Sequence, residues 1–94
     1  MLTVIATIRA QPEHADKLHD VMARLAATSR AEEGCRGYHV LRCAEDASLF
    51  MTFEQWTDTG AESRHLTSAH VAAALAVARP LLAAPLEIRH FSEL

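Results

Sequence analysis

The sequence has few cysteines and none of the short patterns that hold metal ions. Cys35 and Cys43 stand at the two ends of one predicted strand. At ~3.3 Å per residue they would lie about 26 Å apart, whereas a disulfide needs Cα atoms within about 7 Å. The patterns CxxC, HxH and HExxH are absent, so a structural zinc site has no support. We expect neither a disulfide nor a bound metal.

Long apolar runs and an excess of basic residues are also missing. The longest apolar run covers only residues 71–78, while a membrane-spanning helix needs ~20 residues. Nine Lys and Arg against 12 Asp and Glu give a net charge of −3, the wrong sign for binding nucleic acid. The amino terminus shows no basic segment followed by an apolar one, so no secretory signal is expected and a cytoplasmic location is the default.

Glycine-rich loops are absent as well. With three glycines in all, the sequence contains neither GxGxxG nor GxSxG. These absences exclude a Rossmann site for flavin or nicotinamide and the nucleophile elbow of a serine hydrolase. We therefore expect no cofactor, and any redox chemistry would have to come from the substrate itself.

What remains is an ordinary globular composition. Half of the residues are hydrophobic and 22% are charged, and no low-complexity segment interrupts the chain. A chain of 94 residues is too short for two separate cores, so residues 1–94 form a single domain. Small domains bury little surface, which makes self-association an expectation.

Hydrophobic periodicity predicts a β-α-β-β-α-β order. Alternating apolar residues predict strands over residues 2–10, 35–43, 48–56 and 86–91. Helical spacing predicts one helix between Pro12 and Gly34, a short one from Asp58 to near Leu66, and a longer one capped by Thr67 or Ser68. Pro80 is expected to kink or end the last helix. This order is typical of the α+β ferredoxin-like fold, a four-stranded antiparallel sheet with helices on one face.

The third predicted strand is apolar on both sides. Phe50 and Trp56 lie on one side, and Leu49, Met51 and Phe53 on the other. A small monomer cannot leave the second group in water, so we expect a homodimer in which two sheets face each other as a dimeric α/β barrel. The pocket for chemistry would then lie between sheet and helices.

Three residues of this strand form a polar and aromatic group. Thr52, Glu54 and Trp56 alternate along the strand and therefore share one face. A carboxylate beside an indole on an apolar face is a candidate catalytic group. The alternative is that Glu54 pairs with an arginine such as Arg89 or Arg9, and that Trp56 is simply part of the core.

Two histidines flank the predicted junction between the second and third helices. On one continuous helix, His65 and His70 would lie about 140° apart and could not act together. They converge only if the helix breaks between them, and Thr67 and Ser68 are suitable caps for such a break. The alternative is that each histidine caps a helix or faces solvent.

Four segments together resemble the antibiotic biosynthesis monooxygenase family. They are residues 1–9 (MLTVIATIR), 32–38 (EEGCRGY), 54–56 (EQW) and 65–70 (HLTSAH). They follow one another in the family's order along almost the whole chain. The likeness is strongest to the small bacterial quinol monooxygenases.

The resemblance implies a dimeric α/β barrel that oxidises a quinol or polyphenol with O₂, without metal or flavin. A general base removes a phenolic proton, the anion passes one electron to O₂, and the radical pair combines on carbon. A histidine suits the base because its ordinary pKa is about 6.5. The catalytic candidates are His70, His65 and Glu54, and the choice between the two histidines is open. The candidate substrate-binding residues are Trp56, Tyr38, Thr52, Thr7 and Arg89.

The sequence also departs from parts of the family. Polyketide-oxidising and haem-degrading relatives place an asparagine where this chain has Thr52 or Thr7, so the donor that holds the substrate oxygen is not reproduced. The paired histidines also resemble members that isomerise a phosphorylated signal molecule without oxygen. Three hypotheses therefore stand: a quinol monooxygenase, an isomerase or decarboxylating enzyme, and a dimeric ligand-binding or stress-response domain without turnover.

Overall fold

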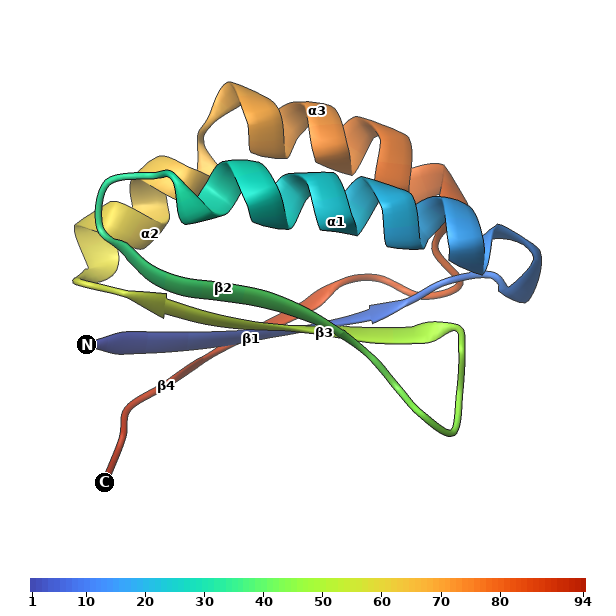
Figure 1. The fold of residues 1–94 in the computed structure, drawn as a ribbon, viewed down its shortest axis with the longest axis horizontal. Helices are drawn as coiled ribbons and strands as arrows, with labels where there is room; N and C mark the ends of the chain where they lie inside the picture. The colour runs from blue at the N-terminus through green and yellow to red at the C-terminus, as the bar shows by residue number, and fades with distance from the viewer.

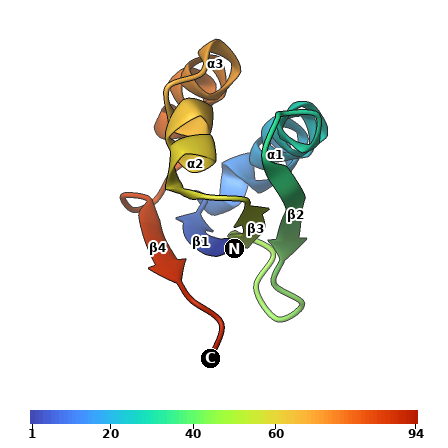
Figure 2. The same cartoon turned by 90° about the vertical axis from the view of Figure 1, so that its left-hand side faces the viewer.

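Four antiparallel strands form one sheet in the order β2-β3-β1-β4. The computed structural model describes all residues, 1–94. Figure 1 shows the sheet below a layer of helices, and Figure 2 shows that all the helices lie on the same face. The strands are β1 (Leu2–Arg9), β2 (Cys35–Arg42), β3 (Leu49–Trp56) and β4 (Glu87–Phe91). The predicted ferredoxin-like α+β fold is confirmed.

The helices follow the predicted order, including the division of the second helical region into a short and a longer helix. A 3-10 turn, η1 (Pro12–His14), precedes α1 (Ala15–Arg30), and the second helical region contains α2 (Thr59–Leu66), α3 (Ala69–Ala78) and the 3-10 turn η2 (Arg79–Leu81). Pro80 lies in η2, because a proline cannot donate the hydrogen bond that would continue α3. None of these helices combines the length and the apolar composition that a membrane span requires.

The two faces of the sheet differ as the alternation predicts. On the inner face, Val4 and Ile8 of β1 and Phe50 of β3 are buried against α1, whose Leu18 and Met22 are also buried. On the outer face, Met51 and Phe53 are each 38% exposed, and Leu41 of β2 pairs with Met51 across the strands. A row of apolar side chains therefore faces away from the helices.

The two cysteines are free, as predicted. Cys35 begins β2 and Cys43 directly follows that strand, so the chain holds them at opposite ends. Burial raises the pKa of the Cys35 thiol, with the carboxylates Glu32 and Glu54 adding to the effect. The thiol is consequently kept in its protonated, unreactive form.

Gly34 sets the turn between α1 and β2. We expected α1 to run up to this glycine, but the helix ends at Arg30, and residues 31–34 form the turn that precedes β2. Gly34 adopts a positive φ of 86°, which only glycine adopts without strain. Its carbonyl accepts a hydrogen bond from the backbone N–H of Thr57 at 2.9 Å, which joins this turn to the end of β3.

Replacing Gly34 with alanine should destabilise the fold by about 2–4 kcal/mol. An added Cβ would lie 2.5 Å from the Cβ of Ala61 and 3.0 Å from Oγ1 of Thr57, besides forcing alanine into the left-handed region. Urea unfolding measures the loss. Gly60→Ala is the matched control, because that glycine lies within α2 and its nearest contacts are polar side-chain ends at 3.3 Å or more. Equal stability of the two variants would contradict this account of Gly34.

Candidate functional site

A break between α2 and α3 brings two histidines together. The α2 helix ends at Leu66, and Ser68 caps α3: its hydroxyl accepts from the N–H of Val71 at 3.4 Å and donates to the carbonyl of His65 at 2.7 Å. The rings of His65 and His70 consequently lie 5.9 Å apart. The two histidines therefore converge, as expected if the helix breaks between them.

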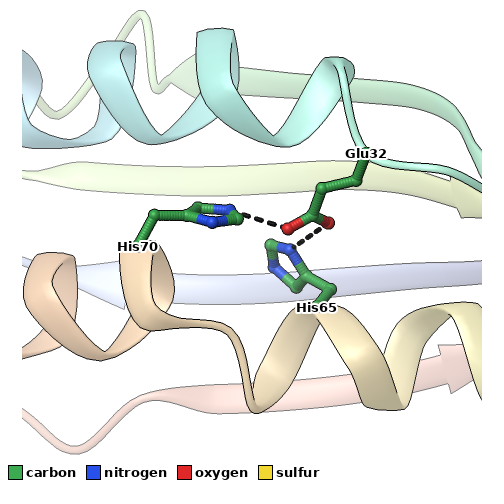
Figure 3. Close-up of side chains that lie close together, drawn as sticks. All are labelled: Glu32, His65 and His70. Carbon is green, nitrogen blue, oxygen red and sulfur yellow. Dashed lines mark hydrogen bonds and ion pairs between the residues drawn. The ribbon is translucent and has the colours of Figure 1, made fainter.

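Glu32, in the turn after α1, lies between the two histidines (Figure 3). Its Oε2 lies 2.9 Å from Nδ1 of His65 in a hydrogen bond. Its Oε1 lies 2.7 Å from Nε2 of His70, but the ring N–H does not point at the oxygen, and this buried nitrogen has no hydrogen-bond partner. Sequence analysis did not single out Glu32, although it opens one of the four family-like segments.

His65 is held in one orientation by its neighbours. Its side chain is only 4% exposed, and its ring packs against Trp56 at 4.8 Å and Tyr38 at 5.4 Å between centroids. An ionised carboxylate can only accept, so Glu32 selects the tautomer in which Nδ1 carries the proton. The neutral imidazole then keeps its free lone pair on Nε2, where a base needs it.

Glu54 is buried among donors from its own strand. Oγ1 of Thr52 donates to Oε2 at 2.7 Å, and Nε1 of Trp56 donates to Oε1 at 3.0 Å. Thr52 in turn accepts from the N–H of Ala6 at 3.1 Å. Burial raises the pKa of Glu54 above its usual value, although the two hydrogen bonds and His65 oppose the shift. The partners of Glu54 are thus neutral groups, not the arginine considered as an alternative.

An apolar cavity of about 80 Å³ lies between the sheet and the helices, where the pocket was predicted. Thirteen of its 17 lining residues are hydrophobic, and no lysine or arginine is among them. The four polar lining residues are Thr52, Glu54, Glu62 and His65, and Tyr38 is among the hydrophobic ones. The cavity is smaller than the ~150 Å³ that holds a benzene molecule, so an aromatic ligand requires the walls to move.

Glu62 and His90 form a second carboxylate–histidine pair at the edge of this cavity. The buried Glu62 of α2 accepts from Nε2 of His90, with both oxygens within 2.9 Å, and His90 comes from the otherwise exposed strand β4. This contact ties β4 to α2. Sequence analysis missed the pair, because the two residues are 28 positions apart and neither stands in a local pattern.

Of the remaining predicted site residues, some line the cavity and others do not. Tyr38 lines the cavity, and burial raises the pKa of its hydroxyl, which therefore stays protonated. Trp56 is fully buried behind Glu54 and His65 and does not line the cavity. His70 lines an open groove between α1 and α3 instead.

Two predicted substrate-binding residues lie away from the cavity. Thr7 alternates with the buried Ala6 and Ile8, so it lies on the outer face of the sheet beside Met51. Arg89 is 72% exposed on β4, where its contact is Glu87 at 3.5 Å. The parity of each strand directs both side chains away from the helices.

Comparison with known proteins agrees with this architecture. The sequence profile of the antibiotic biosynthesis monooxygenase family matches residues 1–77. The chain belongs to this family. It is 31% identical over 88 residues to YcnE of Bacillus subtilis, covering 94% of this chain and 93% of YcnE. It is 35% identical over 83 residues to "Probable quinol monooxygenase YgiN" of Escherichia coli, covering 78% and 80%.

A solved structure resembles this family member over almost its full length. PA3566 from Pseudomonas aeruginosa superposes with a TM-score of 0.92 at 38% sequence identity. The match covers 99% of this chain and 93% of PA3566. The match therefore spans the segments that contain Glu32, His65 and His70 in this chain.

Glu54→Gln should change the pH dependence of stability in a defined direction. The pKa of Glu54 is higher in the folded than in the unfolded chain, so wild-type free energy of unfolding falls as pH rises through that interval. The variant has no titrating group there. Its free energy of unfolding should therefore rise relative to wild type with pH, by about 1.4 kcal/mol per unit of pKa elevation. Urea titrations from about pH 4 upwards test this.

The control for this measurement is Glu87→Gln on the exposed strand β4. Glu87 is 60% exposed and contacts only Arg89, so its removal should leave the slope unchanged. A difference between Glu54→Gln and wild type that stayed constant with pH, or fell as pH rose, would contradict the assignment.

Proposed function

We propose that this protein is a monooxygenase that oxidises a small, uncharged quinol or related phenol with O₂, taking its electrons from the substrate. The observation that supports this most is His65: a cavity-lining histidine whose proton is held on Nδ1 by Glu32, which leaves Nε2 as the base. The naming of YgiN as a probable quinol monooxygenase agrees with it. His65 would remove the proton, Glu32 would orient His65, and the apolar cavity would enclose the substrate.

The proposed reaction begins with proton transfer. Nε2 of His65 takes a phenolic proton, and Glu32 stabilises the imidazolium that forms. The phenolate is electron-rich and passes one electron to O₂, and the resulting radicals combine at a ring carbon. For a hydroquinone, the product is a hydroxyquinone, and the second oxygen atom leaves as water.

The charge of the cavity supports an uncharged substrate. Two buried carboxylates, Glu54 and Glu62, line it, and no lysine or arginine does. A phosphorylated ligand would meet negative charge in a medium of low dielectric constant, which costs several kcal/mol. The isomerase alternative, which needs a cation for a phosphate, is therefore disfavoured.

Substrate entry requires the cavity to enlarge. The inner residues Leu86 and Ile88 of the β4 region form one wall, and the side chains of β4 are exposed on their other sides. We infer that this wall moves outward to admit a ring, since β4 is an edge strand whose side-chain hydrogen bond to the helices is the contact between His90 and Glu62. Trp56 acts from behind the cavity, by holding Glu54 and His65.

His65→Ala should lower the rate of oxygenation by about 10²–10⁴, the usual contribution of a positioned general base. His70→Ala should lower it by about 10–100-fold, because His70 acts on the base only through Glu32. The assay is turnover of a reduced naphthoquinol under ¹⁸O₂, with mass spectrometry of the product. One ¹⁸O atom per hydroxyquinone reports enzymatic insertion.

The controls separate catalysis from autoxidation. Heat-denatured protein gives the background rate, and His19→Ala removes an exposed histidine that contacts only Asp20, so it should match wild type. Product without ¹⁸O, or equal rates for wild type and His65→Ala with several quinols, would contradict the proposed function.

We also propose that two copies associate through the outer face of the sheet. Leu41, Met51 and Phe53 form an apolar row on that face, and Phe91 pairs with Thr3 at its edge. A patch of this kind on a small domain favours burial against a second copy. The antiparallel sheets of the two copies would then pack face to face.

Met51→Asp should convert the protein to a monomer, since an unpaired charge in the interface costs several kcal/mol. Light scattering after size exclusion should give twice the 10.3 kDa chain mass for wild type and the single mass for the variant. Val77→Asp is the matched control, because Val77 is 46% exposed on the helical layer. A wild-type monomer at micromolar concentration would refute the association.

A further inference from the structure

Glu32, His65 and His70 present one ligand atom each to a common point. The ligand atoms all lie within 4.8 Å of one another, and they come from three separate elements: the turn after α1, the end of α2 and the start of α3. Two imidazoles and one carboxylate form a donor set that Zn²⁺ and other divalent first-row metals use in proteins.

The contact between His70 and Glu32 is unsatisfied without a cation. Nε2 of His70 is buried and lies 2.7 Å from Oε1, yet neither atom gains a hydrogen bond from the other. A buried polar atom without a partner costs free energy. A cation bound by both atoms would satisfy them together, which is an independent indication of a ligand.

The site is both charged and reachable. Glu32 supplies a full negative charge, and its ion-pair partners are the two histidines, so no lysine or arginine neutralises it. His70 is 28% exposed and lines the open groove between α1 and α3, which provides an entry path from solvent. Figure 3 shows the three side chains converging, with Glu32 coming from the turn after α1 and the two histidines from α2 and α3.

We propose that Glu32, His65 and His70 form a binding site for one divalent transition-metal ion of the Zn²⁺ class. This differs from the sequence expectation of no bound metal, because the three ligands are brought together by the fold and not by a short motif. Bonds of about 2.0–2.2 Å place tetrahedral ligand atoms roughly 3.4 Å apart. The present atoms lie within 4.8 Å of one another, so the most distant pair must approach by up to about 1.4 Å. His70 stands in the first turn of α3 and is partly exposed, which leaves its side chain room for this adjustment. Water completes the coordination.

A bound ion would reverse the tautomer of His65. The metal takes the lone pair of Nδ1, so the single proton of the neutral ring moves to Nε2. The ring then faces the cavity as a donor and cannot accept a phenolic proton. This consequence rests on the proposed function, whereas the metal site itself does not. Loading the site would therefore switch off the base.

Cobalt titration tests the site without any turnover. Chelator-treated protein receives Co²⁺, and four-coordinate Co²⁺ bound by the histidines gives visible absorption bands that saturate at one ion per chain. Zn²⁺ should abolish these bands, because it binds such sites more tightly than Co²⁺. Glu32→Gln and His70→Ala should each weaken the apparent affinity for Co²⁺ by about 100-fold. Loss of a residue that only supports a metal ligand already costs about 10–100-fold, and these two residues are ligands themselves.

His90→Ala is the matched control, because it removes the chain's other buried carboxylate–histidine contact and leaves the three ligands in place. It should bind Co²⁺ like wild type, with circular dichroism showing that all variants are folded. Equal affinities for wild type and His70→Ala, or no Co²⁺ absorption in excess metal, would overturn the proposal. Saturable Co²⁺ binding by a protein that oxidises no quinol would refute the proposed function alone.

Discussion

The carboxylate of Glu32 is the contact on which the candidate site depends. It joins the turn after α1 to the end of α2 and the start of α3. Two local features accompany the contact: the positive φ of Gly34, which shapes the turn from α1 into β2, and the Ser68 cap, which ends the continuous helix that would separate the histidines. Backbone conformation and side-chain chemistry therefore cooperate.

His65 shows how packing converts this contact into a defined chemical state. Trp56 and Tyr38 restrict the ring from two sides, and Glu32 determines which nitrogen is protonated. A histidine free to rotate would spend its time in many orientations and both tautomers. Here the orientation is settled before any ligand arrives, which is the condition under which a base contributes most.

Much of the fold follows from local pattern, and much of the site does not. The alternation in β1 and β3 predicts which side chains are buried, and Thr67 and Ser68 indicate the helix break. The contact of Glu32 with His65 spans 33 positions, and no periodicity encodes such a pairing. Strand parity could have excluded Thr7, because its buried neighbours already assign it to the outer face.

Trp56 and Arg89 illustrate two further limits on predicting side-chain positions from sequence. The aromatic type and strand position of Trp56 predict burial equally well in a substrate pocket or behind one, and only the packing of α2 over β3 decides that it lies behind. Arg89 stands out in the sequence only as a charged residue within an alternating strand. Its strand is the edge of the sheet, where a long charged side chain reaches water at less cost than an interior carboxylate.

The partners of the carboxylates in and beside the cavity determine whether His65 can act as a base. Glu54 and Glu62 are stabilised by neutral donors or by His90, and Glu32 by two histidines, so each buried carboxylate has a partner that titrates or stays uncharged. None of these three carboxylates is paired with a lysine or arginine. The same property makes the Glu32 group receptive to an external cation: whatever occupies Nδ1 of His65, a proton or a metal ion, decides whether Nε2 can act as a base.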